Sequence, residues 1–115
     1  MFRFETLDVW KRSIEFTDTL FDLADELEAK KRFRFAEQLR GAVLSVSNNI
    51  AEGSGSSSRN EFKQFLNYSH RSVFESANMI IICHRRSYLD ELKRQQHLAD
   101  LEQISKMIIG FSRSL

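Results

Sequence analysis

Residues 35–61 read FAEQLRGAVLSVSNNIAEGSGSSSRNE, and this stretch decides the fold. Its first part carries apolar residues at three- and four-residue spacing, which predicts a helix over about 33–52. The apolar face of that helix consists of Phe35, Leu39, Ala42, Val43, Val46 and Ile50. A Gly/Ser-rich loop follows, so we expect Gly53 to close the helix as a left-handed C-cap. Ser58 and Glu61 then have the spacing of a capping box, which starts another helix.

The same apolar spacing predicts three more helices, over about 7–29, 59–86 and 90–113. The chain of 115 residues contains no proline and only four glycines, so it has few of the residues that build turns and sheet corners. Four helices of similar length with short links pack most simply as an up-down-up-down antiparallel bundle. The predicted fold class is therefore all-α, with one four-helix-bundle domain over 1–115.

Two apolar rows run along the first predicted helix, about 110° apart if each residue turns the chain by about 100°. The first row consists of Leu7, Trp10, Ile14, Phe21 and Ala24. The second row consists of Val9, Phe16, Leu20, Leu23 and Leu27. Because a bundle helix needs only one such stripe, the second row, with Val9, Phe16 and Leu20, has two interpretations. It faces another subunit, or it wedges the helix deeply into the core.

Composition excludes several classes of protein. The formal net charge of +1 gives no global field that favours nucleic acid or an acidic membrane. The single Cys83 cannot form an internal disulfide, and no apolar run approaches the ~20 residues of a membrane span. The first ten residues carry acids where a secretion signal would be apolar. We therefore expect a cytoplasmic protein without a membrane partner.

No catalytic or metal-binding motif is present. No glutamate has a histidine three residues later, as a di-iron bundle requires, and the Gly/Ser loop lacks the lysine of a phosphate-binding loop. His70, His84 and His97 are too far apart in sequence to share a ligand site, so we expect them on the surface. Cys83 is expected to be a small core residue. We predict a protein that is not an enzyme and needs no cofactor or metal.

The predicted topology brings cations together that are distant in sequence. The first and third links of an up-down-up-down bundle lie at the same end. That end would carry Lys30, Lys31, Arg32, Arg34, Arg85, Arg86 and Arg94. These side chains either complement the dipoles of helix C-termini and solvate the end, or form a basic patch that binds the phosphates of RNA.

The second predicted helix is unusually rich in polar residues and poor helix formers between residues 38 and 53. Gly41 and Ser45 are small enough to let a neighbouring backbone approach, and Asn49 can pair with Glu52 along the helix surface. Gly41, Ser45 and Asn49 therefore either form polar contacts between helices or subunits, or belong to a polar binding surface.

Residues 38–53, QLRGAVLSVSNNIAEG, resemble the signature QLRRAAVSIPSNIAEG of the bacterial four-helix-bundle family, also called the 23S ribosomal RNA intervening-sequence proteins. The resemblance extends to Phe4, Leu7 and Trp10 near the start and to residues 110–115 at the end. Gly41 stands in place of the second arginine of the signature and Ser47 in place of its proline. The chain therefore resembles a divergent member of this family.

The resemblance implies an assembly and partners. The family is similar to the accessory proteins of diversity-generating retroelements, which assemble as barrel-like pentamers and bind RNA and a reverse transcriptase. It thus implies a homopentamer that binds structured RNA or a ribonucleoprotein partner. The expected phosphate contacts are Lys30, Lys31, Arg32, Arg34, Arg85 and Arg86, joined by Arg40 if the second helix lines the interior of the oligomer. The alternative is an oligomeric scaffold that binds another protein, such as a reverse transcriptase, and no nucleic acid.

Overall fold

The computed structural model describes residues 1–115 and contains only helices. A short 3-10 helix, η1, spans Arg3–Thr6, and four α-helices follow it. Their bounds are α1 Asp8–Ala29, α2 Phe33–Ser54, α3 Arg59–Arg85 and α4 Glu91–Ser114. Each bound lies within two residues of its predicted position. The all-α four-helix bundle predicted from the apolar spacing is confirmed.

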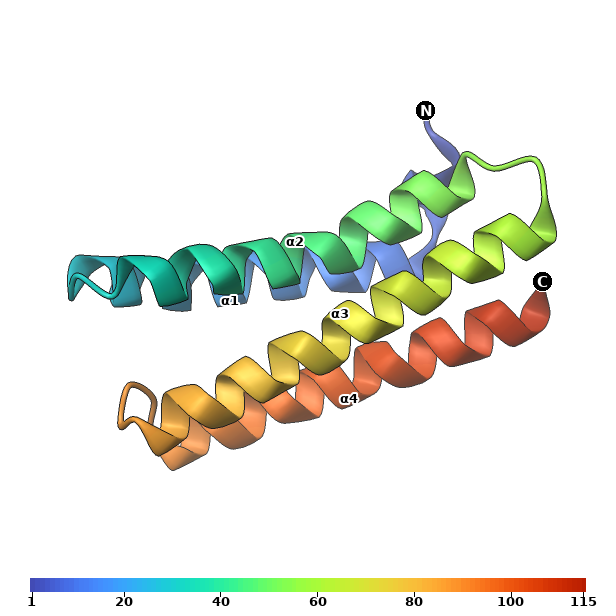
Figure 1. Cartoon of the computed structure of the whole chain (residues 1–115). Coiled ribbons are helices and arrows are strands. Elements are labelled where there is room, and N and C mark those ends of the chain that lie inside the picture. Colours follow the sequence, from blue (N-terminus) through green and yellow to red (C-terminus); the bar gives the residue numbers. More distant parts are fainter.

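The four helices run up, down, up and down, and the molecule is about 44 × 22 × 20 Å. Figure 1 shows α1 beside α2 and α3 beside α4, with both chain termini and the α2–α3 loop at one end. The α1–α2 and α3–α4 links therefore lie at the other end. No helix here combines the length and the apolarity that crossing a membrane requires.

Side-chain caps start the third and fourth helices. The Asp90 carboxylate accepts a hydrogen bond from the backbone N–H of Lys93 at 2.8 Å, at the N-terminus of α4. At the N-terminus of α3, the Ser58 hydroxyl accepts from the Glu61 N–H at 3.2 Å. The return bond of the expected capping box is replaced, because the Ser58 N–H donates to the Ser56 hydroxyl instead.

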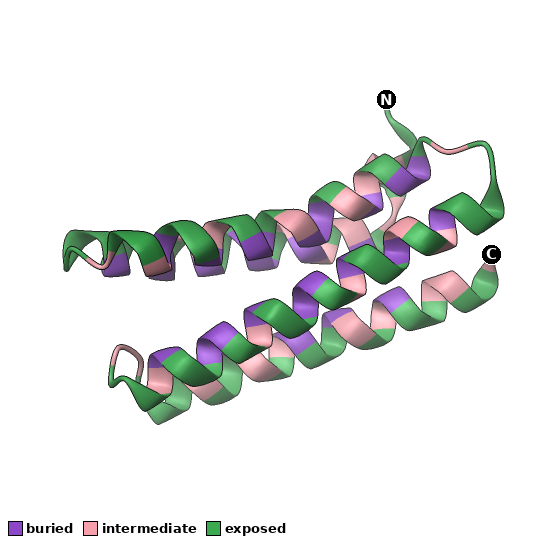
Figure 2. Ribbon diagram, viewed as in Figure 1, coloured by how far each residue is buried: buried purple, intermediate pink, exposed green.

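A single apolar core runs along the bundle axis, where the buried stripes of the four helices meet (Figure 2). On α1 the buried residues include Val9, Phe16 and Leu20, each no more than 3% exposed. The second apolar row therefore packs inside the subunit, and its interpretation as a contact with another subunit is wrong. In the first row, Ile14 and Phe21 stay partly exposed on the flank of α1.

Two glycines of α2 differ from their expected roles. Gly53 does not end the helix in a left-handed conformation, since α2 continues to Ser54 and no glycine has a positive φ. Gly53 is instead buried where α2 meets α3, and an added Cβ would lie 2.7 Å from Cβ of Phe65. Gly41 is exposed and has no atom within 4 Å of such a Cβ, so no neighbouring backbone approaches it within the subunit.

The three histidines have different environments. His70 and His84 are partly exposed, but His97 on α4 is only 6% exposed, so the expectation of a surface histidine is wrong there. The His97 ring lies edge-on to Phe16 of α1, with 6.5 Å between the ring centroids. Its Nδ1 atom is buried without a hydrogen-bond partner.

Candidate nucleic-acid interface

Helices α1 and α3 end in the same kind of turn, although neither turn contains glycine. Lys31 and Ser87 each adopt the left-handed conformation, with φ of 65° and 62°. After α1, the Arg32 N–H donates to the carbonyl of Leu27 at 2.9 Å, and after α3 the Tyr88 N–H donates to the carbonyl of Cys83 at 2.8 Å. In each turn this hydrogen bond spans six residues, which is the pattern of a Schellman motif. The motif folds the chain sharply back toward the next helix.

The two turns meet, as the topology predicts. The Arg32 guanidinium of the α1–α2 link lies 4.0 Å from the centre of the Tyr88 ring in the α3–α4 link, a cation–π contact. The cations Arg32 and then Arg86 lower the pKa of Tyr88, because both stabilise the phenolate. The Tyr88 ring is also edge-on to Phe35 of α2. Tyr88 thus joins the two links into one surface.

Six cations of this surface form no salt bridge, and we call the surface that they make the basic end. They are Lys30, Lys31, Arg32, Arg34, Arg85 and Arg86. All except Arg32 are exposed. One acid is close by, since Glu26 lines the same small hollow as Lys30 and Arg32. Arg94 differs, since it pairs with Glu91 at 3.1 Å. The basic end is therefore a local concentration of positive charge on a chain whose net charge is only +1.

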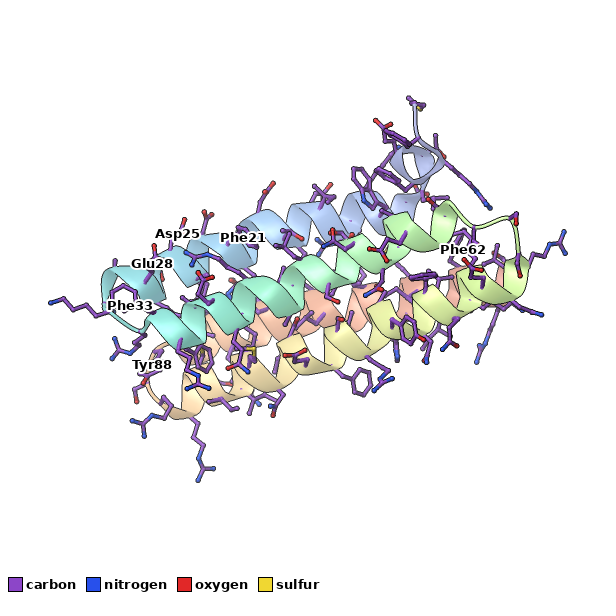
Figure 3. The ribbon with its side chains drawn as sticks, turned by 45° about the horizontal axis from the view of Figure 1, so that its top comes forward. Phe21, Asp25, Glu28, Phe33, Phe62 and Tyr88 are labelled. Carbon is purple, nitrogen blue, oxygen red and sulfur yellow. The ribbon has the colours of Figure 1, made fainter.

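An exposed aromatic ring lies among these cations. Phe33, the first residue of α2, is 57% exposed and stands in sequence between Arg32 and Arg34 (Figure 3). The sequence prediction did not include Phe33 or Tyr88 in the site. The signal was present in residues 30–34, because an aromatic residue interleaved with four cations is typical of surfaces that stack bases and contact phosphates.

Arg40 is bound differently from the basic end. Its guanidinium contacts Asp25 at 2.7 Å, Glu37 at 2.8 Å and Glu28 at 3.2 Å, and its side chain is only 16% exposed. The hydrogen bond that Arg40 donates to Asp25, more than any other contact, raises the pKa of Arg40 above its ordinary range. With three carboxylates around it, Arg40 has no net positive charge to offer a phosphate. It links α1 to α2 instead.

Ser45 and Asn49 form a polar contact between α2 and α3. The Asn49 amide donates to the carbonyl and the hydroxyl of Ser45, at 2.8 and 3.0 Å. The Ser72 hydroxyl of α3 donates to the Ser45 hydroxyl at 2.8 Å. A shallow groove of about 410 Å³ lies over this network, with Tyr68 and Arg71 among its walls. Ser45 and Asn49 therefore pack helices together and also line a polar surface.

No group of three histidine, cysteine or acidic side chains is arranged to hold a metal ion. Cys83 is buried, and burial raises the pKa of its thiol to about 11. The thiol is thus protonated at neutral pH and is not a nucleophile.

The fold and the site define a small all-α bundle in which six cations at one end form no salt bridge. Residues 5–110 match the family described as 23S rRNA-intervening sequence protein, and the chain belongs to this family. It is similar in fold to a crystal structure of a protein of unknown function from the S23 ribosomal protein family of Bacteroides thetaiotaomicron. The TM-score is 0.86 at 23% identity, covering 90% of this chain and 97% of the other. A comparison with curated proteins gives no match.

Proposed function

We propose that this protein is a non-enzymatic, homo-oligomeric bundle that binds structured RNA, alone or in a ribonucleoprotein, through the basic end. The observation that carries the proposal is the juxtaposition of six cations without salt bridges, in or next to two links that lie more than 50 residues apart. The contact between Arg32 and Tyr88 holds the two turns that carry these charges side by side. Such a patch matches the closely spaced phosphates of a folded RNA better than a single mobile loop would.

The charge distribution of the whole chain favours binding of the RNA at the basic end over binding at the side of the bundle. The exposed acids Asp18 and Asp22 lie on the outer face of α1, where they repel a polyanion from the side of the bundle. Phe33 adds a face on which an unpaired base can stack beside the phosphate contacts. The RNA we propose therefore has a stem and a loop of unpaired bases. The family name, which refers to 23S rRNA, agrees with such a partner and with a cytoplasmic location.

The resemblance to pentameric relatives leads us to propose a homopentamer. Arg40 is left out of the proposed RNA surface because Asp25, Glu28 and Glu37 neutralise it. The phosphate contacts of the proposal are Lys30, Lys31, Arg32, Arg34, Arg85 and Arg86.

Filter binding of an RNA hairpin over a series of salt concentrations tests the proposal. The test variant replaces Lys30, Arg34 and Arg85 by glutamine, and a matched control replaces three exposed cations elsewhere. The control cations are Lys11, Arg59 and Arg71. The test variant should bind more weakly and lose about three units of the log–log salt slope, because each phosphate contact contributes about one unit. The control variant should keep most of the RNA affinity and most of the salt slope.

Equal losses of RNA affinity in the two variants would mean that the RNA binds elsewhere on the protein or binds nonspecifically. Absence of RNA affinity for the wild-type protein, even at low salt, would overturn the proposal. In that case, capture of a protein partner that survives nuclease treatment, a reverse transcriptase for example, would support the alternative of a protein-interaction scaffold.

A further inference from the structure

The bundle leaves an apolar groove uncovered between α3 and α4. The groove has a volume of about 360 Å³, and its apolar walls are Val73, Phe74, Ala77, Ile81, Leu98 and Leu101. Phe74 is 64% exposed and Ile81 is 44% exposed. Large apolar side chains exposed together on a soluble protein are typical of a binding surface. We call this surface the α3/α4 groove.

Along the α3/α4 groove and the hollow next to it, three of the four charged lining residues are basic. Lys106 and Glu102 line the apolar part, and a second hollow of about 240 Å³ between the same helices is lined by Lys63 and Arg113. None of these three cations forms a salt bridge. The occupant of the groove therefore needs an apolar ridge with acidic flanks.

The same chain carries such a surface on its other side, along the outer junction of α1 and α2. Phe21 lies one turn before Asp25 on α1 (Figure 3). Because Asp25 pairs with Arg40 of α2 and the two helices are antiparallel, Leu44, one turn beyond Arg40, lies level with Phe21. Leu44 is 40% exposed, and Phe21 and Ile14 are partly exposed. We call this surface the α1/α2 face.

Acidic residues flank the α1/α2 face. Asp18 and Asp22 are exposed on α1 and form no salt bridge. Asp25 and Glu37 share the charge of Arg40. The α1/α2 face is therefore an apolar ridge with an acidic border, and Figure 1 shows its two helices on the opposite side of the bundle from α3 and α4.

We propose that the α1/α2 face of one copy binds in the α3/α4 groove of the next. The inference rests on the proposed homo-oligomer and names its interface. Apolar surface meets apolar surface, and the acidic border meets the basic residues along the groove. Two identical α1/α2 faces would instead oppose like charges, as would two identical grooves, so a symmetric dimer is disfavoured. A contact between two different surfaces repeats head to tail, and it forms a ring when the rotation between copies closes.

Two single substitutions test the interface, since each places a carboxylate in one of its apolar halves. Leu44→Asp alters only the α1/α2 face, and Phe74→Asp alters only the α3/α4 groove. Leu92→Asp is the matched control, because Leu92 is also 64% exposed but lines neither surface. Circular dichroism checks that all three proteins remain folded. Light scattering then measures their masses at equal concentration.

We expect Leu44→Asp and Phe74→Asp each to be a monomer of about 13.5 kDa and Leu92→Asp to keep the wild-type mass. Mixing the two monomeric variants should give a 1:1 dimer and nothing larger, because Phe74→Asp supplies an intact α1/α2 face and Leu44→Asp an intact groove. If only one substitution breaks the oligomer, or if mixing gives no dimer, the head-to-tail contact is overturned. If both variants keep the mass of an oligomeric wild type, the interface is wrong but the oligomer stands. A monomeric wild type would contradict the proposed homo-oligomer itself.

Discussion

Lys31 occupies a backbone conformation that favours glycine, at the centre of the basic end. A residue with a Cβ pays about 1 kcal/mol or more to adopt the left-handed region. We therefore predict that Lys31→Gly raises the free energy of unfolding by about 1 kcal/mol, as measured by urea denaturation. The same change should weaken RNA binding and remove about one unit of salt slope.

Lys30→Gly is the control for this prediction. Lys30 has a φ of −92°, so glycine there relieves no strain and should leave the protein equally or less stable, while removing the same charge. A Lys31→Gly protein that is less stable than Lys30→Gly would contradict the conformational argument. Comparing the two variants separates the conformational strain at Lys31 from the effect of losing one positive charge.

His97 makes the stability of the bundle depend on pH. Burial lowers the pKa of His97 below its ordinary value of 6.5, and nearby Lys93 lowers it further, while Asp100 and Glu26 oppose the shift. The unfolded chain therefore binds this proton more readily than the folded one. Stability is fully present above about pH 6.5 and should fall at lower pH, with a slope of up to about 1.4 kcal/mol per pH unit.

Urea denaturation between about pH 5 and pH 8 measures this dependence. His97→Leu fills the site with an apolar side chain and should flatten the curve over that range. His70→Gln, at a partly exposed position where the ring bonds Ser105 at 2.7 Å, should leave it unchanged. A wild-type slope retained in His97→Leu would assign the dependence to another group.

At the scale of the helix, α2 contains two glycines with opposite roles. An added methyl group at Gly53 would collide with Phe65 and Phe62 of α3, at 2.7 and 2.8 Å. Gly53→Ala should therefore destabilise the protein by about 1–3 kcal/mol, because the aromatic side chains must move apart. Gly41→Ala has open space and should stabilise it by about 0.5–1 kcal/mol through helix propensity. Thermal unfolding measures whether Gly53→Ala lowers and Gly41→Ala raises the stability of the protein.

The two rows of α1 show what apolar spacing predicts and what it leaves open. Spacing alone predicted the four helices, because an amphipathic stripe depends only on the local chain. It could not decide how deeply each row is buried, since the row from Val9 to Leu27 and the row from Leu7 to Ala24 both satisfy helical periodicity. The row from Val9 is buried throughout, whereas only Ala24 of the other row is fully buried. That difference depends on how α1 is rotated against its neighbours. Arg12 contributes to it by bonding Asp100 and Gln103 of α4, at 2.8 and 2.9 Å.

The candidate site was also predictable only in part: its position followed from the topology, but its individual contacts did not. Bundle topology alone brought the cations of two links to one end, and the structure brings Arg32 onto Tyr88 there. The neutralisation of Arg40 was not predictable, because it depends on the register between α1 and α2 that sets Asp25 and Glu28 beside it. The left-handed turns were also missed, because neither Lys31 nor Ser87 is the glycine that usually signals them.

At the scale of the whole molecule, the proposed assembly predicts how strongly the proposed RNA is held. One repeated head-to-tail contact in a closed ring sets every basic end on the same rim. A structured RNA can then contact several copies at once, so the second contact forms at a high effective concentration. We predict that monomeric Phe74→Asp binds the same hairpin at least ~10²-fold more weakly than the wild type, although its basic end is intact.

Filter binding of Phe74→Asp beside Leu92→Asp measures this difference. The control keeps both surfaces of the contact, so it should lose much less affinity than Phe74→Asp. A small loss is expected, because Leu92 lies in the first turn of α4 and its new carboxylate is at the same end of the bundle as the basic end. Equal affinity of the monomeric variant and the control would mean that a single basic end accounts for all the binding. The assembly would then serve another purpose.

The absence of proline, together with short links between successive helices, also has a kinetic consequence. Each helix packs against its neighbour in sequence, so loop closure costs little entropy and the subunit should fold rapidly. Because no X–Pro bond exists, the unfolded chain carries no slowly exchanging cis isomers. Refolding of the subunit should therefore lack the phase of tens of seconds that isomerisation causes. Any slow phase that does appear should speed up with protein concentration, because it would report the encounter of subunits.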